Sequence, residues 1–256
     1  MGRQLVAKKN WTDFLAPVLI FLVAVLGFEI IIKTLEVPRW ILVPPSSIIS
    51  VLIGEFDSKI LPNLLVTVET IFWGYLFAVP LGIIVAILLN QFRTINKAFS
   101  PYILVIISTP MLVLVPLLYM WFGIGMSTRV IAVALQSFTI LNLNASVGFN
   151  TVDPLKLELM QSLGAGRWQR LKYVIIPSSL PNIFNGMRMS SISATTAALG
   201  SEFAGSTVGL GAGIVYASNY IQTELMFSYI AIVAVIGILL YVLPSLLEKM
   251  VIRWKI

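Results

Sequence analysis

The 256-residue sequence contains no cysteine and no histidine, and only 11% of its residues are charged. The absence of cysteine excludes disulfides and thiolate chemistry, and the absence of histidine excludes imidazole metal ligands and the usual proton shuttle. An enzyme acting inside a membrane would still need convergent acid, base or nucleophilic groups, and only scattered Glu and Ser residues are available. We therefore predict no catalytic residue and no metal site.

The sequence also lacks the Gly-x-x-x-x-Gly-Lys-Ser/Thr loop that cradles nucleotide phosphates. The chain is therefore not expected to bind ATP itself, and no other cofactor is predicted for it. Its net charge of +6 could suggest nucleic acid, but the basic residues are spread among the ends of apolar stretches instead of forming one basic stripe. No nucleic acid partner is predicted.

Long apolar stretches dominate the rest of the sequence. Hydrophobic residues make up 58% of the chain and its mean hydropathy is +0.95, whereas a soluble domain carries roughly 25% charged residues. Because a helix needs about 20 apolar residues to cross a bilayer, six stretches predict transmembrane helices near residues 14–35, 63–90, 99–122, 130–150, 182–205 and 226–247. Barrel strands would alternate in polarity instead. We predict an all-α polytopic membrane protein in which residues 1–256 form one transmembrane domain.

The Lys and Arg residues predict the orientation of these helices. With the amino terminus in the cytoplasm, thirteen of the seventeen basic residues fall on the cytoplasmic side, in agreement with the positive-inside rule. The four on the outer side are Lys33, Arg39, Lys59 and Arg129. The even number of helices and the charge bias agree, so both termini are predicted to be cytoplasmic.

Two local features are expected near the outer end of the first helix. Glu29 and Lys33 stand four residues apart and should form an ion pair on one helix face. After a Pro-Pro pair, the hydroxyl of Ser46 or Ser47 is expected to cap a short amphipathic helix over residues 48–56.

A polar, basic segment, residues 153–181, interrupts the apolar stretches. Asp153-Pro154 favours a helix start, because it supplies an N-cap carboxylate and a proline in the first turn. About thirteen helical residues would extend roughly 20 Å along the membrane face. The Gly-Ala-Gly sequence at residues 164–166 should end this helix, and two later prolines should turn the chain back toward the membrane. Such a segment predicts a docking site for a soluble partner.

The spacing of a glutamate, a glycine and a valine in this segment resembles the EAA motif of permease subunits of bacterial ATP-binding-cassette importers. Five residues separate the glutamate from the glycine, and nine separate the glycine from the valine. Leu and Met follow the glutamate, where the motif usually has alanines. In that family the motif contains the coupling helix, which docks on the ATPase. The matching residues are Glu158, Gly164, Val174, Ile176 and Pro177.

Two further stretches extend the resemblance over nearly the full length. Residues 110–125 are similar to the third-span pattern of importers for aliphatic sulphonates, taurine, nitrate and bicarbonate, and for pyrimidine or flavin vitamin precursors. Residues 201–211, which begin Ser-Glu-Phe-Ala-Gly, are most similar to the branch that handles vitamin precursors and aromatic compounds.

The resemblance implies the type I importer permease fold, with a cytoplasmic coupling helix in a loop at about residues 153–181. It implies a multi-pass protein of the bacterial plasma (inner) membrane that forms the solute pathway. The implied partners are a second copy of this permease, two copies of a cytoplasmic ATPase that uses ATP and Mg²⁺, an extracytoplasmic solute-binding protein, and the lipid bilayer. The solute is expected to be a small organic anion or a vitamin precursor. The residues expected to serve ATPase coupling are Glu158, Leu163, Gly164, Ala165, Trp168 and Pro177.

Carboxylates and prolines inside the predicted helices are candidates for the solute pathway or its gate. A charged side chain at mid-membrane costs about 2.5–3.5 kcal/mol on insertion scales. Glu202 could line the outer gate or contact the binding protein, or it could cap the following loop at the water interface. Glu69 could pair with Arg129, face the pathway or reach the outer surface, and the prolines could hinge a gate or serve packing alone. The candidates are Glu69, Pro110, Pro116, Ser201 and Glu202.

A self-sufficient secondary transporter or a channel is the alternative function. It would predict internal inverted repeats and paired broken helices near the midplane, which the sequence does not show. It also leaves residues 153–181 without a role. Dependence of transport on a separate ATPase would distinguish the two functions.

Overall fold

The computed structural model describes residues 11–252, and within that range the chain forms helices and no strand. The two chain termini, which are predicted to be cytoplasmic, lie outside this range. The helices in chain order are α1 (Trp11–Thr34), α2 (Pro45–Gly54), α3 (Leu61–Gln91), α4 (Arg93–Ser108), α5 (Met111–Phe122), α6 (Met126–Asn150), α7 (Pro154–Ser162), α8 (Arg167–Arg170), α9 (Ile176–Phe203), α10 (Leu210–Asn219) and α11 (Thr223–Val251), with short π-helical segments at Phe56–Ile60 and Leu171–Ile175.

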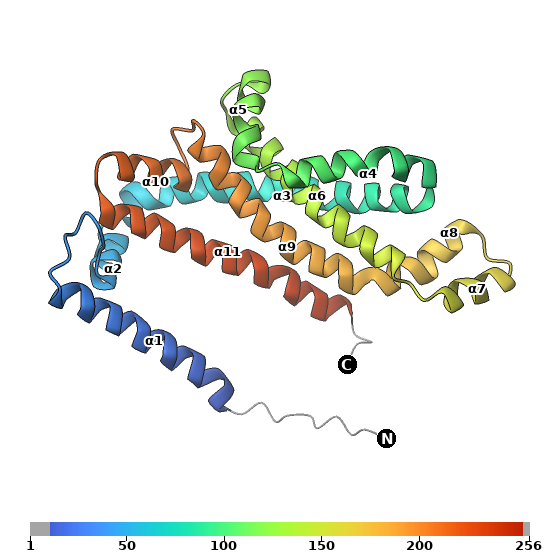
Figure 1. The fold of residues 1–256 in the computed structure, drawn as a ribbon, viewed down its shortest axis with the longest axis horizontal. Helices are drawn as coiled ribbons and strands as arrows, with labels where there is room; N and C mark the ends of the chain where they lie inside the picture. The colour runs from blue at the N-terminus through green and yellow to red at the C-terminus, as the bar shows by residue number, and fades with distance from the viewer. Residues whose placement is uncertain (1–10, 253–256) are drawn as a thin grey trace.

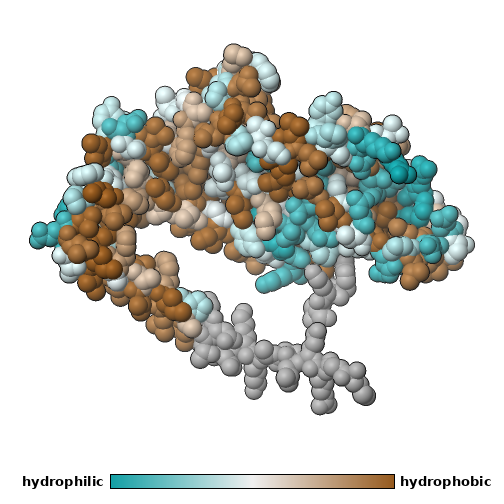
Figure 2. All heavy atoms as spheres, in the orientation of Figure 1, coloured by the Kyte–Doolittle hydropathy of each residue, from teal (hydrophilic) through white to brown (hydrophobic). Residues whose placement is uncertain are grey.

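The long helices run along a common direction, with α7 and α8 at one end of the bundle and α2 and α10 at the other (Figure 1). On the face in view, hydrophobic residues cover α1 and much of the bundle, and hydrophilic residues gather toward the end that carries α7 and α8 (Figure 2). This arrangement confirms the predicted all-α membrane fold. We call the end with α7 and α8 the inner end and the end with α2 and α10 the outer end.

Length and apolar composition support four of the six predicted membrane-spanning helices as continuous helices, and a fifth as a bent pair. Four helical stretches in the described part of the chain are long and apolar enough to cross a membrane: Leu15–Thr34, Phe56–Gln91, Met126–Asn150 and Thr223–Val251. The third predicted helix is not continuous, because α4 and α5 meet at an angle of 105° and together make at most a fifth span. The break falls at Thr109 and Pro110, and proline lacks the amide hydrogen that would continue the helix.

The helix predicted near residues 182–205 corresponds to α9, which is long enough to span but less apolar than the others. Ser, Thr and Asn recur along its length. α9 packs against α6, α11 and α3, and twelve of its residues are buried. Several of its hydroxyls donate within the helix, as Ser191 does to the carbonyl of Arg188 at 2.8 Å. Protein instead of lipid surrounds this polar face, so α9 does not need an apolar composition.

Glycines allow α6 to approach its neighbours closely. A Cβ added at Gly186 of α9 would lie 2.8 Å from Cβ of Asn144 and 3.0 Å from Cδ1 of Leu141, both on α6. A Cβ at Gly148 of α6 would lie 2.7 Å from Cβ of Asn182 on α9. These separations are shorter than van der Waals contact, so the two helices can pack this closely only because glycine has no side chain at these positions.

We expect Gly186→Val to lower the free energy of unfolding by about 1–3 kcal/mol, because it overpacks this interface. Gly237→Val on α11 is the matched control, since nothing lies within 4 Å of a Cβ at that position. Thermal unfolding of the purified variants in detergent is the measurement. Equal midpoints for the two variants would contradict the packing described here.

Glu29 joins α1 to α2 at the outer end. Its carboxylate accepts from Nζ of Lys33 at 2.6 Å, which confirms the predicted ion pair, and from the backbone N–H of Ser46 at 3.1 Å. The prediction of a serine hydroxyl cap is wrong, because α2 already begins at Pro45 and has no side-chain cap at Pro44. A carboxylate from the preceding helix reaches the free amide instead. Only 6% of the apolar stretch of α1 is buried, and its main neighbour is α2.

Candidate functional site

The segment at the inner end begins as the sequence predicts. The carboxylate of Asp153 accepts from the backbone N–H of Leu155 at 2.9 Å, and Pro154 opens α7. The helix ends at Ser162 after nine residues, so it extends about 14 Å and not the predicted 20 Å. Gly164 follows with φ of +76°, a left-handed conformation that glycine adopts at low cost and that commonly ends helices.

Large apolar side chains in this segment are exposed. No residue of α7 is buried, and four large apolar side chains of α7, α8 and the turn between them are 61–72% exposed. Exposure of this much apolar surface is unfavourable in water, at about 25 cal/mol for each Å². Clusters of this kind mark contact surfaces. We call the four residues, Leu155, Leu159, Leu163 and Trp168, the inner contact surface.

The six residues predicted to serve ATPase coupling lie in or next to this segment. Glu158 and Gly164 are exposed, and Ala165 is half-buried. Pro177 lies in the first turn of α9, which follows directly on the π-helical segment Leu171–Ile175. The helix continues through Pro177 and Pro181, so the prediction that these prolines turn the chain is wrong. The chain reverses earlier, between Ser162 and Arg167.

A pocket of about 440 Å³ lies between this segment and the inner ends of α3 and α6. Arg167 and Arg170 line it, together with Asn90 and Asn150. In the sequence these arginines stood out only as basic residues on the cytoplasmic side, because their meeting with α3 and α6 depends on the fold. Two guanidinium groups and two side-chain amides form a suitable environment for a carboxylate.

The outer end contains a buried carboxylate. Glu202, at the end of α9, is 1% exposed. Its Oε1 accepts from the hydroxyl of Thr67 on α3 at 2.8 Å, and its Oε2 accepts from the backbone N–H of Gly211 on α10 at 2.7 Å. Charge-assisted hydrogen bonds of this kind offset the cost of burying a carboxylate.

Two further amides at the start of α10 find partners on α3. The hydroxyl oxygen of Thr67 accepts from the N–H of Leu210 at 2.8 Å, and Oδ1 of Asn63 accepts from the N–H of Gly209 at 2.9 Å. Three successive amides that the helix leaves free are thus satisfied by side chains. We call Asn63, Thr67, Glu202 and residues 209–211 the Glu202 network.

This geometry matches the alternative in which Glu202 caps the following loop, although the carboxylate is buried and does not lie at a water interface. A role in a gate stays a prediction, and it would require the Glu202 network to open. Ser201 is also buried. Its hydroxyl donates to the carbonyl of Ala198 at 2.6 Å, and its own carbonyl accepts from the hydroxyl of Tyr119 at 2.7 Å.

The possible pairing of Glu69 with Arg129 is not found. Arg129 is buried, and its Nη1 donates to Oγ of Ser206 at 2.9 Å and to the carbonyl of Val208 at 3.1 Å. The start of α6 lies beside the loop that follows α9, so the arginine binds that loop. Glu69 is exposed on α3. The partners of Arg129 are 77 and 79 residues away in the sequence, so local spacing could not predict them.

The two candidate prolines have different surroundings. Pro110 immediately precedes α5, at the point where α4 and α5 meet at an angle of 105°. Pro116 lies inside α5, which continues to Phe122. Hinge motion at either proline stays a prediction.

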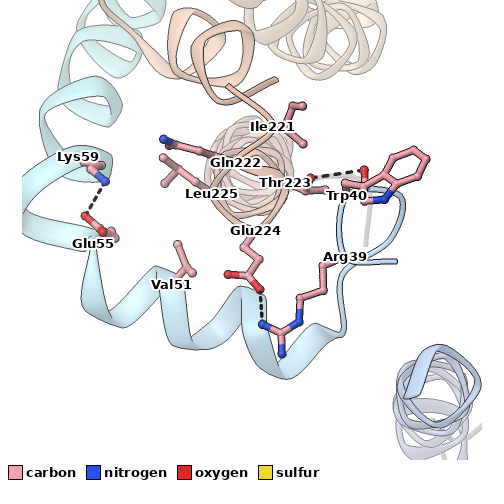
Figure 3. A pocket seen from close by; sticks show the side chains of 10 residues that line it. All are labelled: Arg39, Trp40, Val51, Glu55, Lys59, Ile221, Gln222, Thr223, Glu224 and Leu225. Atoms are coloured by element: carbon pink, nitrogen blue, oxygen red, sulfur yellow. Dashed lines mark hydrogen bonds and ion pairs between the residues drawn. The ribbon is translucent and has the colours of Figure 1, made fainter. Parts of the chain in front are cut away.

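A pocket of about 580 Å³ opens at the outer end, between the α1–α2 loop, α2 and the start of α11 (Figure 3). Arg39 pairs with Glu224 at 3.5 Å, and Lys59 pairs with Glu55 at 3.2 Å. The ammonium of Lys59, with a smaller contribution from a serine hydroxyl, lowers the pKa of the Glu55 carboxyl. Because both pairs are exposed, salt and competing charges weaken them, and these side chains are available to another protein.

Known proteins match most of the chain. The family described as binding-protein-dependent transport system inner membrane component matches residues 78–253. The riboflavin transport system permease protein RibX of Chloroflexus aurantiacus is 36% identical over 163 residues, which cover 64% of this chain and 61% of RibX. The taurine transport system permease protein TauC of Escherichia coli is 28% identical, with 82% of this chain and 79% of TauC covered. A solved amino acid ABC transporter with histidines has a TM-score of 0.64 at 26% identity, with 77% of this chain and 96% of that chain covered.

Proposed function

Because this chain belongs to the family of binding-protein-dependent transport system inner membrane components, we propose that it forms the solute pathway of an importer driven by a separate cytoplasmic ATPase. The predicted resemblance to permease subunits of ATP-binding-cassette importers is confirmed by this family membership and by its relatives. The proposal adds that the ATPase binds ATP and Mg²⁺, and that this permease transmits the resulting motion to the pathway.

The inner contact surface carries the proposal. It lies beyond Asn150, where the membrane-spanning helix α6 ends, and we place it on the cytoplasmic side of the bilayer. Docking of an ATPase on α7 and α8 would bury the exposed leucines and the indole, and apolar burial is the main favourable term in protein association. Arg167 and Arg170, in the adjacent pocket, suit acidic residues of the docked subunit.

The other proposed partners meet other surfaces. The outer pocket, with its two exposed ion pairs, suits an extracytoplasmic solute-binding protein. A second copy of this permease would cover apolar surface that the single chain leaves exposed, and we propose a homodimer with two ATPase copies. Both termini are proposed to be cytoplasmic in a bacterial inner membrane. RibX is named for riboflavin and TauC for taurine, and the solute of this chain is proposed to be a vitamin precursor or a small organic anion.

We expect a Walker-type ATPase to copurify with the wild-type chain when the chain is extracted from its native membrane in detergent. Trp168→Ala should lower the retained ATPase about tenfold or more, because buried tryptophans at interfaces often contribute over 1.4 kcal/mol. Trp40→Ala is the matched control, since Trp168 and Trp40 are both 66% exposed but lie at opposite ends of the molecule. The ratio of ATPase to permease by mass spectrometry is the measurement.

Two results would count against this proposal. Equal ATPase retention by the two tryptophan variants would exclude Trp168 from the docking site. Purification of the wild-type chain alone, together with solute movement in liposomes without ATP, would favour the secondary transporter instead.

A further inference from the structure

A cavity of about 390 Å³ lies where α4 and α5 break, and α6 and α9 complete its walls. Its volume falls in the range of small-molecule sites, about 300–1,000 Å³. Met111, Leu112 and Phe203 supply apolar walls. The cavity therefore has the size and the lining of a site for a small ring compound.

Uncharged polar groups also line this cavity. They are Gln136 on α6 and Ser193 and Thr196 on α9, and none of the lining residues is charged. Oε1 of Gln136 is buried and has no hydrogen-bond partner among the residues that the structure describes. A buried acceptor without a partner is unfavourable and rare in native proteins, so it calls for a ligand or another explanation.

The depth of Gln136 makes this unpaired acceptor more significant. It lies ten residues after Met126 in α6, which corresponds to about 15 Å along the helix. Helix α6 continues for fourteen residues beyond it to Asn150, so the acceptor lies near the middle of this membrane-spanning helix, where little water is available to satisfy it. A solute that donates a hydrogen bond there would supply the missing partner.

The chemistry of the lining favours donors over anions. The hydroxyl of Thr196 donates to the carbonyl of Ile192 at 3.2 Å and so presents its oxygen as an acceptor to the cavity. Oε1 of Gln136 is a second acceptor, and the Ser193 hydroxyl can accept or donate. An anion at this depth would lose its hydration without meeting a cation among the lining residues.

We propose, on the basis of the importer function proposed above, that this cavity contacts the solute during transport and selects an uncharged, hydrogen-bond-donating ring compound over a small organic anion. Of the two solute classes that the family suggests, this choice favours a neutral heterocyclic vitamin precursor. Gln136 and Ser193 make the polar contacts, and the apolar walls hold the ring.

The cysteine-free sequence allows a direct test, because Ser193→Cys introduces the single thiol of the chain. The probes are the neutral hydroxyethyl and the anionic sulfonatoethyl methanethiosulfonates, applied to the complete transporter in nanodiscs. Ser218→Cys, at an exposed serine of α10, supplies the intrinsic ratio of the two rates at the protein surface. Labelling is measured on the permease band alone.

We expect the neutral reagent to modify Ser193→Cys at least about tenfold faster than the anionic reagent, after division by the ratio at Ser218→Cys. Gln136→Lys in the Ser193→Cys background should reverse this preference, because it places a cation beside the thiol. Equal rates, faster anionic labelling, or no labelling by either reagent at position 193 would overturn the proposal.

The same nanodiscs separate this inference from the function on which it rests. If the ATPase is present and Ser218→Cys reacts normally while Ser193→Cys shows no charge preference, the solute site is refuted and the importer stands. If no ATPase copurifies, the importer and the solute site fall together.

Discussion

Gly164→Trp should reduce ATP-dependent solute uptake about a hundredfold, which corresponds to about 2.7 kcal/mol of lost coupling, while the variant still inserts into the membrane. Nothing in the described chain lies within 4 Å of a Cβ at Gly164, so the indole would not clash within the permease. It would instead project beside Leu163, in the middle of the inner contact surface. The new side chain would hold the ATPase away from α7 and separate ATP hydrolysis from transport.

A matched control separates this effect from backbone strain. Gly123, at the end of α5, has φ of +79° against +76° at Gly164, and it is equally free of neighbours within 4 Å. Tryptophan is therefore strained at both positions, and Gly123, with ψ of 165°, lies in a region that is essentially restricted to glycine and costs other residues about 1–3 kcal/mol. Helix α5, which Gly123 ends, lies far from α7 (Figure 1). Uptake and ATP hydrolysis in proteoliposomes are the measurements. Normal transport by the Gly164 variant would show that the docking assignment is wrong.

Glu202→Ala should destabilise the protein by about 3 kcal/mol, because the buried partners of the carboxylate lose their acceptor. The N–H of Gly211 would remain without a partner, and the Thr67 hydroxyl would have to reorient. For a chain of this size, the expected decrease in Tm is about 6–12 °C. Glu69→Ala, which removes an exposed carboxylate from α3, should change stability by less than about 0.5 kcal/mol.

The same variants distinguish a cap from a gate. If Glu202 acts only as a cap of α10, Glu202→Gln should fall between wild type and Glu202→Ala in Tm, because the amide keeps one acceptor oxygen. Uptake should then follow the folded fraction. An unchanged Tm in Glu202→Ala together with lost uptake would instead assign the carboxylate to the gate.

The bilayer explains why much of the fold could be predicted. A helix that faces hydrocarbon must consist mainly of apolar residues. Continuous apolar runs in the sequence therefore predicted the positions of α1, α3, α6 and α11. The bend between α4 and α5 was not predictable, because a proline shows where a helix can break and not whether it does. Pro80 and Pro116 lie inside helices that continue, whereas Pro110 stands at a 105° break. Neighbouring helices decide which outcome occurs.

Within the candidate sites, local interactions could also be predicted from the sequence, whereas contacts between distant segments could not. Interactions within one turn of helix could be predicted, such as the Asp153 cap and the Glu29–Lys33 pair. Glu202 and Thr67 are 135 residues apart in the sequence, and no local spacing indicates that they meet. Gln136 also gave no signal, because its unpaired oxygen becomes evident only when α5, α6 and α9 are placed around it.

The polar face of α9 has a consequence for biogenesis. A helix with recurring Ser and Asn residues partitions poorly from the translocon into lipid by itself, since polar side chains near the helix centre oppose insertion. Of the helices that pack against it, α6, which makes the most extensive contact, and α3 precede α9 in the chain and so emerge from the ribosome first, whereas α11 follows. They can be resident in the bilayer when α9 arrives and can receive it directly. The order of synthesis thus supplies the α6 and α3 part of the protein surface around α9 before α9 itself is made.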